Sequence, residues 1–144
     1  MHAILYRSRE RPGLLASDLN DIVETAQVRN RQLDVTGLLL SGHLEILPAA
    51  PGEFVQWIEG PKDEGESLFR SIERDPRHTE VDVLGRGAVA ALVDASSVEM
   101  VSGTDRLFPT WSMGLVRLAE LPATLGGFLR FTETWDGQAF TQAA

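Results

Sequence analysis

Short apolar β-runs alternate with two amphipathic helices along most of this chain, and this alternation restricts the fold to helices layered against a sheet. Strands are expected at residues 2–6, 35–40, 54–59, 81–84 and 107–116, and helices at residues 17–33 and 63–74. Ser17 is expected to cap the first helix and Asp75-Pro76 to end the second, because proline cannot continue a helix. At 144 residues the chain is long enough for one domain with a buried core.

The composition excludes several classes of function. A net charge of −8 argues against a broad surface for nucleic acid or anionic lipid. The absence of cysteine rules out disulfides, thiolate zinc sites and cysteine nucleophiles. The three histidines are scattered without carboxylates at metal-binding spacing, so no metal site is expected. No apolar run approaches the ~20 residues of a membrane span. We therefore expect a cytoplasmic protein without nucleic-acid or membrane partners.

The first helix directs polar groups inward. Its apolar stripe, which begins at Leu19, continues at helical spacing to Arg29 and Asn30. A buried amide without a partner costs about 1–3 kcal/mol, so Asn30 needs hydrogen bonds. Asn30 could bond a neighbouring backbone group while Arg29 extends to water, or both side chains could meet a ligand. The helix by itself leaves both interpretations open.

The third expected strand supplies a second inward carboxamide. With a period of two, Phe54, Gln56 and Ile58 share one face, and Val55, Trp57 and Glu59 share the other. Gln56 therefore lies between two large apolar side chains and needs partners. Its amide can exchange donor and acceptor by rotating. A single buried glutamine is usually structural, but Gln56 together with Asn30 favours a ligand with a polar edge.

Several short motifs of unlike residues follow one another in order. They are Tyr6-Arg7-Ser8, Asn30, Thr36-Gly37, Gln56-Trp57-Ile58-Glu59-Gly60, Arg74-Asp75-Pro76-Arg77-His78 and Phe108-Pro109-Thr110-Trp111-Ser112-Met113-Gly114. Each is weak alone, but the ordered set closely resembles the BLUF domain, a family of blue-light sensors that use a flavin. The resemblance implies a ferredoxin-like α+β sandwich, in which two helices on one face of a mixed sheet hold the flavin.

The resemblance also assigns roles to residues of this chain. Asn30 would bond the carbonyl and ring-nitrogen edge of the flavin, with Arg29 near its pyrimidine side. Tyr6 would bond Gln56, and Gln56 would bond the flavin. The remaining residues around the ring would be Ile22, Leu39, Phe54, Asp75, Arg77 and His78. The expected cofactor is FAD, and FMN and riboflavin stay open because the contacts to the ring are shared.

The mechanism that the resemblance implies is a hydrogen-bond switch. Under blue light Tyr6 would supply an electron and then a proton, and their return would leave Gln56 rotated or tautomerised. A stronger hydrogen bond from Gln56 to the flavin carbonyl at C4 would shift the absorption band to the red until it recovers in darkness. Trp111 or Met113 would report the change to the last strand. A separate partner protein would receive the signal, so no enzymatic activity is expected.

The sequence departs from the family pattern in three places. Residues 42–52 lengthen a hairpin, and residues 87–105 are an addition that looks like an extra hairpin made of Val89–Val93 and Val98–Val101. The extra hairpin could support self-association or simply cover an edge of the sheet. Residues 119–144 form a C-terminal extension with a short helix at residues 124–131, after a flavin-binding domain at residues 1–118.

Two other functions are considered. A flavin-free protein-interaction module with the same scaffold would purify colourless. A small enzyme resembling acylphosphatase would use an arginine and an asparagine on an anion and would turn over acyl phosphates. That enzyme needs a loop that cradles phosphate, whereas residues 9–13 contain a single glycine.

Overall fold

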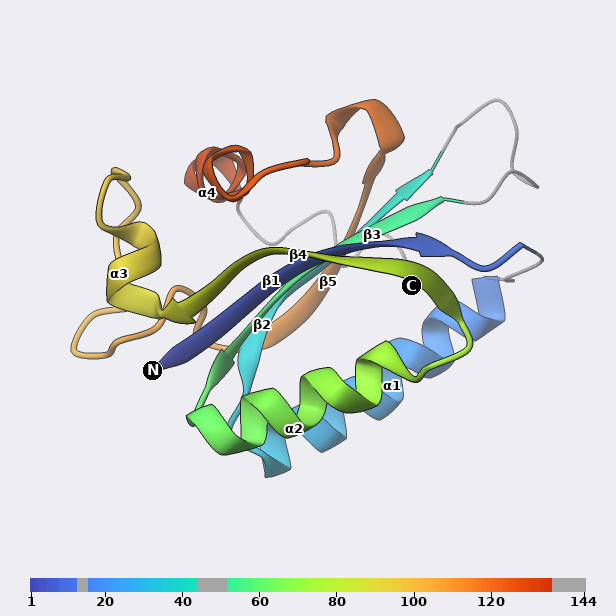
Figure 1. Cartoon of the computed structure of the whole chain (residues 1–144), viewed down its shortest axis with the longest axis horizontal. Coiled ribbons are helices and arrows are strands. Elements are labelled where there is room, and N and C mark those ends of the chain that lie inside the picture. The colour runs from blue at the N-terminus through green and yellow to red at the C-terminus, as the bar shows by residue number, and fades with distance from the viewer. Residues whose placement is uncertain (13–15, 44–51, 136–144) are drawn as a thin grey trace.

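A computed structural model of the chain describes residues 1–12, 16–43 and 52–135. Its centre is a five-stranded sheet in the order β4-β1-β3-β2-β5 (Figure 1). The strands are β1 (His2–Glu10), β2 (Thr36–His43), β3 (Glu53–Gly60), β4 (His78–Ala88) and β5 (Trp111–Arg117). The β2–β5 pair is parallel and the other three pairs are antiparallel, so the sheet is mixed, as expected.

The helices divide between the two faces of the sheet. Figure 1 shows α1 (Ala16–Gln32) and α2 (Lys62–Glu73) side by side on one face, which we call the helix face. The opposite face carries α3 (Val89–Val93) and α4 (Leu125–Thr134), with the short 3-10 helix η1 (Leu118–Glu120) after β5. The order β1-α1-β2-β3-α2-β4 with strand positions 4-1-3-2 is ferredoxin-like, which confirms the expected fold class.

Alternate side chains of β3 pack into the apolar clusters on the two faces of the sheet. Phe54 and Ile58 join apolar clusters under α1 and α2, whereas Val55 and Trp57 join the cluster under α3 and α4. Burying each such side chain contributes about 1.5–3 kcal/mol. Gln56 follows the helix-face residues, so its expected orientation is confirmed.

The expected extra hairpin is wrong. β4 continues to Ala88, residues 89–93 form α3, and residues 98–101 lie outside any strand. Val89 and Val93 are four residues apart, which is helical spacing, and both are buried in the cluster beneath α4. Ala90 and Ala91 between them favour helix strongly. Burial of the two valines on one side of a helical turn explains the difference.

Other boundaries also differ from expectation, since β1 continues to Glu10 and β4 spans His78–Ala88. α1 begins at Ala16, so Ser17 lies within its first turn instead of capping it. The last strand begins at Trp111 instead of residue 107, because the backbone N–H groups of Leu107 and Phe108 bond the side chain of Glu59. The lengthened segment at residues 42–52 lies mostly outside the described residues, since β2 ends at His43.

Backbone geometry directs the chain from α1 into β2. Asp34 has a left-handed φ of 57°, and the N–H of Val35 bonds the carbonyl of Asn30 at 2.8 Å, which closes the helix with a Schellman motif. Gly37 has a φ of 154°, and a Cβ there would lie 1.9 Å from the carbonyl oxygen of Trp57. Only glycine lets β2 approach β3 at this point.

The expected C-terminal helix is confirmed as α4. Thr124 caps it, because its Oγ1 accepts a hydrogen bond from the N–H of Gly127 at 3.0 Å. Trp135, directly after the helix, lies against β5 at Gly114, where a Cβ would come within 2.3 Å of the indole. Residues 136–144 of the extension lie outside the described residues.

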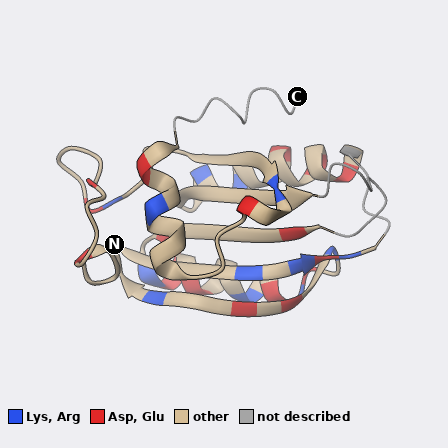
Figure 2. Ribbon diagram, turned by 90° about the horizontal axis from the view of Figure 1, so that it is seen from above, with Lys and Arg blue, Asp and Glu red and all other residues tan. Residues whose placement is uncertain are grey.

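Charged residues are interspersed over the described elements, as Figure 2 shows. On β4, Arg86 bonds Glu66, and its guanidinium lies over the ring of Phe69 at 5.3 Å from the ring centroid. Within the described ranges no helix combines the length and the apolar character that crossing a bilayer requires.

Candidate functional site

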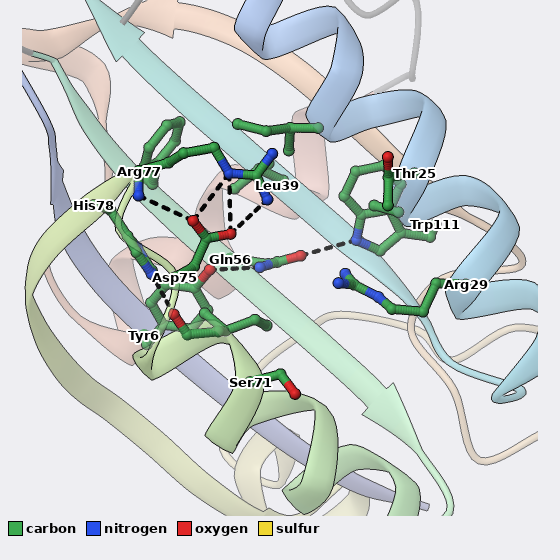
Figure 3. A pocket seen from close by; sticks show the side chains of 14 residues that line it. Tyr6, Thr25, Arg29, Leu39, Gln56, Ser71, Asp75, Arg77, His78 and Trp111 are labelled. Atoms are coloured by element: carbon green, nitrogen blue, oxygen red, sulfur yellow. Dashed lines mark hydrogen bonds and ion pairs between the residues drawn. The ribbon is translucent and has the colours of Figure 1, made fainter.

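A pocket lies between the helix face of the sheet and the two long helices (Figure 3). It is partly open to solvent. Its lining comprises Tyr6, Ile22, Thr25, Ala26, Arg29, Leu39, Phe54, Gln56, Ser71, Ile72, Asp75, Arg77, His78 and Trp111. The fold thus brings together every predicted site residue except Asn30 and Met113.

A chain of side-chain hydrogen bonds crosses the floor of this pocket. Tyr6 and Gln56 are paired across β1 and β3, and Gln56 Nε2 donates to Tyr6 Oη at 2.5 Å. Trp111 Nε1 donates to Gln56 Oε1 at 2.9 Å. An indole nitrogen only donates, so the carboxamide oxygen must face Trp111 and the NH₂ must face Tyr6. The orientation of the amide is therefore determined by its neighbours.

Burial controls the ionisation of the groups in this chain. It raises the pKa of the Tyr6 phenol above its ordinary value, although the bond from Gln56 and the nearby Arg29 lower that pKa. Tyr6 is therefore a neutral phenol near pH 7. Burial also lowers the pKa of Arg29, whose guanidinium points toward the pocket in Figure 3.

Asn30 is the least satisfied polar group near the pocket. It is fully buried, and its Oδ1 accepts a hydrogen bond from Arg29 Nε at 3.2 Å. Its Nδ2 has no hydrogen-bond partner among the described residues. Asn30 lines a neighbouring cavity instead of the main pocket, and Trp111 lines both. The expected alternative, an Asn30 side chain bonded to nearby backbone, is not what the structure shows, and the free donor suits a ligand with an acceptor edge.

Asp75 and Arg77 form a rigid pair at one edge of the pocket. Arg77 Nε lies 2.9 Å and 3.0 Å from the two oxygens of Asp75, and the backbone N–H of Arg77 bonds the same carboxylate at 2.9 Å. Burial raises the pKa of Asp75, but the bonds from Arg77 outweigh it and hold that pKa below its ordinary value. The pair therefore stays charged and fixes a guanidinium beside the opening.

His78 lines the pocket, but its ring nitrogens bond the protein and not the pocket interior. Its Nε2 lies 2.6 Å from the carbonyl of Ile72, which can only accept, so Nε2 carries the proton. Its Nδ1 then accepts from Ser8 Oγ at 2.7 Å. Both ring nitrogens are thus occupied within the protein, and His78 ties the C-terminal end of α2 to β1. Its ring edge faces Phe54 at a centroid distance of 6.3 Å.

The structure also decides which residue of β5 reaches Gln56. Met113 is buried in the cluster with Trp111 and Phe54 and is paired with Leu39, so it lies behind the pocket wall. Trp111 alone of the two bonds Gln56 in the described structure. Sequence reasoning missed Thr25 and Ser71, two hydroxyls on the helices at the pocket. Helical spacing offered a signal for Thr25, which lies three residues after Ile22 and four before Arg29.

Across the described ranges no group of three or more histidine, aspartate or glutamate side chains is placed to hold a metal ion. The polar groups that line the pocket include a phenol, a carboxamide, an indole, a carboxylate, an imidazole and two guanidinium groups, and the carboxamide of Asn30 lies in the neighbouring cavity. These groups donate and accept hydrogen bonds around an apolar slot, which suits a flat heteroaromatic ligand.

Comparison with known families agrees with this geometry. The sequence model of the BLUF family, described as sensors of blue light using FAD, matches residues 1–114. This chain belongs to the BLUF family. The class of function expected from the ordered motifs, a blue-light sensor that uses a flavin, is thereby confirmed.

Individual relatives show how such domains occur. The photoactivated adenylate cyclase subunit beta of Euglena gracilis is 34% identical over 108 residues, which cover 75% of this chain and 12% of that protein. The blue light- and temperature-regulated antirepressor BluF of Escherichia coli strain K12 is 35% identical over 75 residues, covering 52% of this chain and 17% of that protein. This chain therefore spans less than a fifth of either relative.

A solved structure matches nearly the whole chain. The dark-state structure of BlrB, a BLUF protein, superimposes with a TM-score of 0.59 at 30% identity and covers 99% of this chain and 92% of that one. The BLUF fold thus accounts for the sheet and its helices on both faces.

Proposed function

We propose that this chain senses blue light through FAD held non-covalently in the pocket, and that Tyr6 and Gln56 form its hydrogen-bond switch. The observation that carries the proposal is the bonded chain Tyr6–Gln56–Trp111 beside the unpartnered amide of Asn30. The carboxamide of Gln56 is held by two side chains and can exchange its donor for its acceptor only if Trp111 moves, and Asn30 offers a donor with no partner among the described residues.

The pocket residues suit the isoalloxazine ring of a flavin. Its pyrimidine edge carries carbonyl acceptors and a ring N–H, which complement the amide of Asn30 and the guanidinium of Arg29. Ile22, Leu39 and Phe54 provide apolar walls for the flat ring system. Asp75, Arg77 and His78 also line the pocket and would meet the outer edge of the ring. FAD is the flavin in the family's description, and FMN or riboflavin would share the same ring contacts.

The chain's own residues then perform the switch. Bound flavin supplies the absorption of blue light and, once excited, a strong one-electron oxidant. Tyr6 gives up an electron and, because loss of an electron makes a phenol strongly acidic, a proton as well. The carboxamide of Gln56 lies 2.5 Å from the phenol oxygen and is the nearest group to respond. Return of both particles to Tyr6 leaves Gln56 rotated or tautomerised.

Reversal of Gln56 has a consequence for β5. In the described state the Gln56 oxygen accepts from the indole of Trp111. A rotated amide would turn its NH₂ toward the indole N–H, and two donors repel each other. Trp111 must then shift or lose its bond, and β5 registers the change. Met113, buried beside Trp111, adjusts with it.

The output runs through a partner protein or through a second copy of this chain. The names of the relatives, a photoactivated cyclase subunit and an antirepressor, support coupling of such domains to effectors. We assign the sensor domain to residues 1–118 and treat residues 119–144 as an extension whose α4 helix covers the opposite face. A cytoplasmic location agrees with the absence of cysteine.

An absorption spectrum tests the proposal directly. Purified wild-type protein loaded with FAD is expected to shift its flavin band to the red under blue light and to recover in darkness. Gln56→Leu keeps a similar volume without the amide, so it should bind flavin and show no shift. Gln32→Leu, at an exposed residue of α1 that lines neither the pocket nor the cavity beside Asn30, is the matched control and should shift normally. A normal shift in Gln56→Leu would refute the switch, and failure of wild type to bind any flavin would refute the sensor.

A further inference from the structure

A buried carboxylate lies on the face of β3 opposite the pocket. Glu59 is fully buried and accepts four hydrogen bonds. Oε1 accepts from Trp57 Nε1 at 3.1 Å and from the backbone N–H of Leu107 at 2.8 Å. Oε2 accepts from the backbone N–H of Phe108 at 2.7 Å and from Thr36 Oγ1 at 3.1 Å. The four partners come from β2, from β3 and from the segment that leads into β5.

A buried carboxylate lowers the stability of a protein core compared with an apolar side chain, unless its hydrogen bonds compensate. Removing it from water costs several kcal/mol, and a well-packed apolar side chain at such a site is often as stable or more stable. Burial accordingly raises the pKa of Glu59, against the opposing effect of its four hydrogen bonds. What a carboxylate provides and an apolar residue does not is two acceptor atoms in fixed positions. These atoms bind two consecutive backbone amides, those of Leu107 and Phe108, which precede the first residue of β5.

The preceding residue is fastened to the same end of the sheet. Arg106 Nη1 donates to the carbonyl of Asp34 at 3.0 Å and to Thr36 Oγ1 at 3.0 Å. Its Nη2 lies 3.0 Å from the carboxylate of Asp34, and the Arg106 side chain is only 11% exposed. Three consecutive residues, 106–108, are therefore attached to the α1–β2 turn and to β3. We call these attachments the 106–108 clamp.

The clamp lies close to the switch in sequence. Only residues 109 and 110 separate it from Trp111, and the three residue steps from Phe108 to Trp111 reach at most about 11 Å. The N–H of Gly37 also bonds the carbonyl of Thr110 at 3.2 Å. The backbone that leads into Trp111 is thus held at residues 106–108 and again at residue 110. The indole that bonds Gln56 on the helix face therefore follows a segment that is bonded to a carboxylate on the opposite face.

The same carboxylate is connected to α4. Trp57, which donates to Glu59, stacks on Phe128 with ring centroids 5.7 Å apart and planes at 5°. Phe108, whose N–H bonds Glu59, lies 6.4 Å from Phe128. A displacement of the clamp would therefore disturb both the β5 lead-in and the ring contacts of α4.

We propose that Glu59 is a positioning residue of the light switch: by fixing residues 106–108 it holds the Trp111 indole against Gln56, without touching the pocket. The inference rests on the proposed function in so far as Trp111 takes part in the photocycle. The structural half, that Glu59 positions Trp111, stands independently of light and flavin.

Glu59→Gln tests the structural half in flavin-free protein. Glutamine has the same shape, but its NH₂ would face two donors and could accept from neither. At least one of the backbone amides of Leu107 and Phe108, the one that faces the NH₂, should exchange hydrogen at least about tenfold faster, because its hydrogen bond is lost. The chain has three tryptophans, so in ¹⁵N-tryptophan protein the Trp111 indole N–H gives one of three resonances, and it should shift. Trp111→Phe assigns that resonance.

Glu53→Gln is the matched control. Glu53 lies on the same strand and bonds Arg7 with both carboxylate oxygens, away from residues 106–111. The control removes one charge and one hydrogen-bonded oxygen from β3 without loosening the clamp. It should leave the Trp111 resonance and the exchange of Leu107 and Phe108 as in wild type. Equal changes in both variants would mean that Glu59 supports the strand generally, and the proposal would be wrong.

Flavin-loaded protein tests the functional half. Trp111→Phe should change the rate of dark recovery, and Glu59→Gln should change it in the same direction by about tenfold, which corresponds to about 1.4 kcal/mol. In the Trp111→Phe background, Glu59→Gln should then add nothing, because the group through which it acts is gone. Independent, multiplying effects would overturn the proposal, as would a normal rate in either single variant.

Two further outcomes are separable. If wild type binds flavin without any light-induced shift, the proposed function fails, while the indole resonance still decides whether Glu59 positions Trp111. If Glu59→Gln does not fold, Arg106→Gln opens the other half of the clamp and should move the same resonance and the same rate. A folded Arg106→Gln with both unchanged would overturn the inference.

Discussion

On the helix face of the sheet a buried carboxamide, Gln56, is bonded by two side chains, whereas on the opposite face a buried carboxylate, Glu59, is bonded by two backbone amides as well as side chains. An amide can exchange its donor for its acceptor by rotating, and between a phenol and an indole it does so only if the indole, which can only donate, moves as well. A carboxylate has only acceptors, so rotation gains it nothing, and backbone amides cannot turn away without moving the chain.

The difference teaches how a small domain separates a movable part from a fixed one. The pocket face holds polar groups whose partners can change, and one amide, Asn30, whose donor has no partner among the described residues. The opposite face holds groups with complete hydrogen bonding and stacked aromatic rings. A change of hydrogen bonding on the pocket face can move side chains relative to the sheet because the opposite face stays in place. The predictions that follow substitute residues on each of the two faces.

The largest effect is expected at Tyr6. Tyr6→Phe should bind FAD and lose the reversible red shift completely, because phenylalanine supplies neither an accessible electron nor a proton. Difference spectra after blue illumination measure this. Tyr6 is the only tyrosine of the chain, so a tyrosine signature in infrared difference spectra of wild type belongs to it. A full photocycle in the variant would remove Tyr6 from the switch.

Substitutions on the face opposite the pocket should change the free energy of unfolding instead of the photochemistry. Phe128 is fully buried against Trp57, so Phe128→Ala should lower the free energy of unfolding by about 3–5 kcal/mol. Urea unfolding measures the loss. Phe131→Ala, on the same helix but only half-buried, is the control and should cost clearly less. A loss below about 1 kcal/mol for Phe128→Ala would contradict the role assigned to this face.

Asn30 distinguishes binding from folding. Asn30→Ala should weaken FAD binding about 5- to 150-fold, equivalent to roughly 1–3 kcal/mol, because a buried donor to the ligand is lost. Without flavin the variant loses the bond that Oδ1 accepts from Arg29 Nε at 3.2 Å, but Nδ2 has no partner in the described structure to lose, so the unfolding temperature should fall only slightly. Flavin titration and thermal unfolding measure the two quantities. Gln32→Ala, at an exposed residue of the same helix, is the control, and equal effects of both variants on affinity would refute the assignment.

A second buried carboxylate sharpens the comparison with Glu59. Glu10, at the end of β1, is buried, and its Oε2 has no hydrogen-bond partner within the described ranges, with His43 Nε2 at 3.5 Å. Burial raises the pKa of Glu10 to about 7. The folded state therefore favours the protonated acid, and this stabilisation is full below the unfolded pKa of 4.5 and is lost as the pH rises through 7.

Glu10→Gln stays neutral and should avoid that loss. Its melting temperature should exceed that of wild type at pH 8, with an advantage on the order of 1 kcal/mol that shrinks as the pH falls toward 5. Glu80→Gln, at an exposed residue, should show no such dependence. An advantage of Glu10→Gln that is equal at both pH values would mean that packing, and not ionisation, is responsible.

The sequence by itself determined the fold class and the family, and it predicted the residues that we propose as the switch. Period-two alternation along residues 54–59 is sufficient to place Gln56 on the helix face and Glu59 on the other, because strand geometry is local. The buried stripe of α1 likewise directs Asn30 inward from spacing alone. Ordered motifs identified the family, since a set of unlike residues in sequence is specific without any coordinates.

Only the tertiary structure decided which groups meet. That Trp111 and not Met113 bonds Gln56, and that both nitrogens of His78 are already occupied, depends on segments far apart in sequence. The run at residues 89–93 became a helix because α4 covers it, which local β-propensity could not reveal. The carboxylate of Glu59 acquired its role from amides 48 and 49 residues away. Periodicity fixes the face on which a side chain lies, but its partner depends on where distant segments end, and that is set by the global minimum of packing and hydrogen bonding.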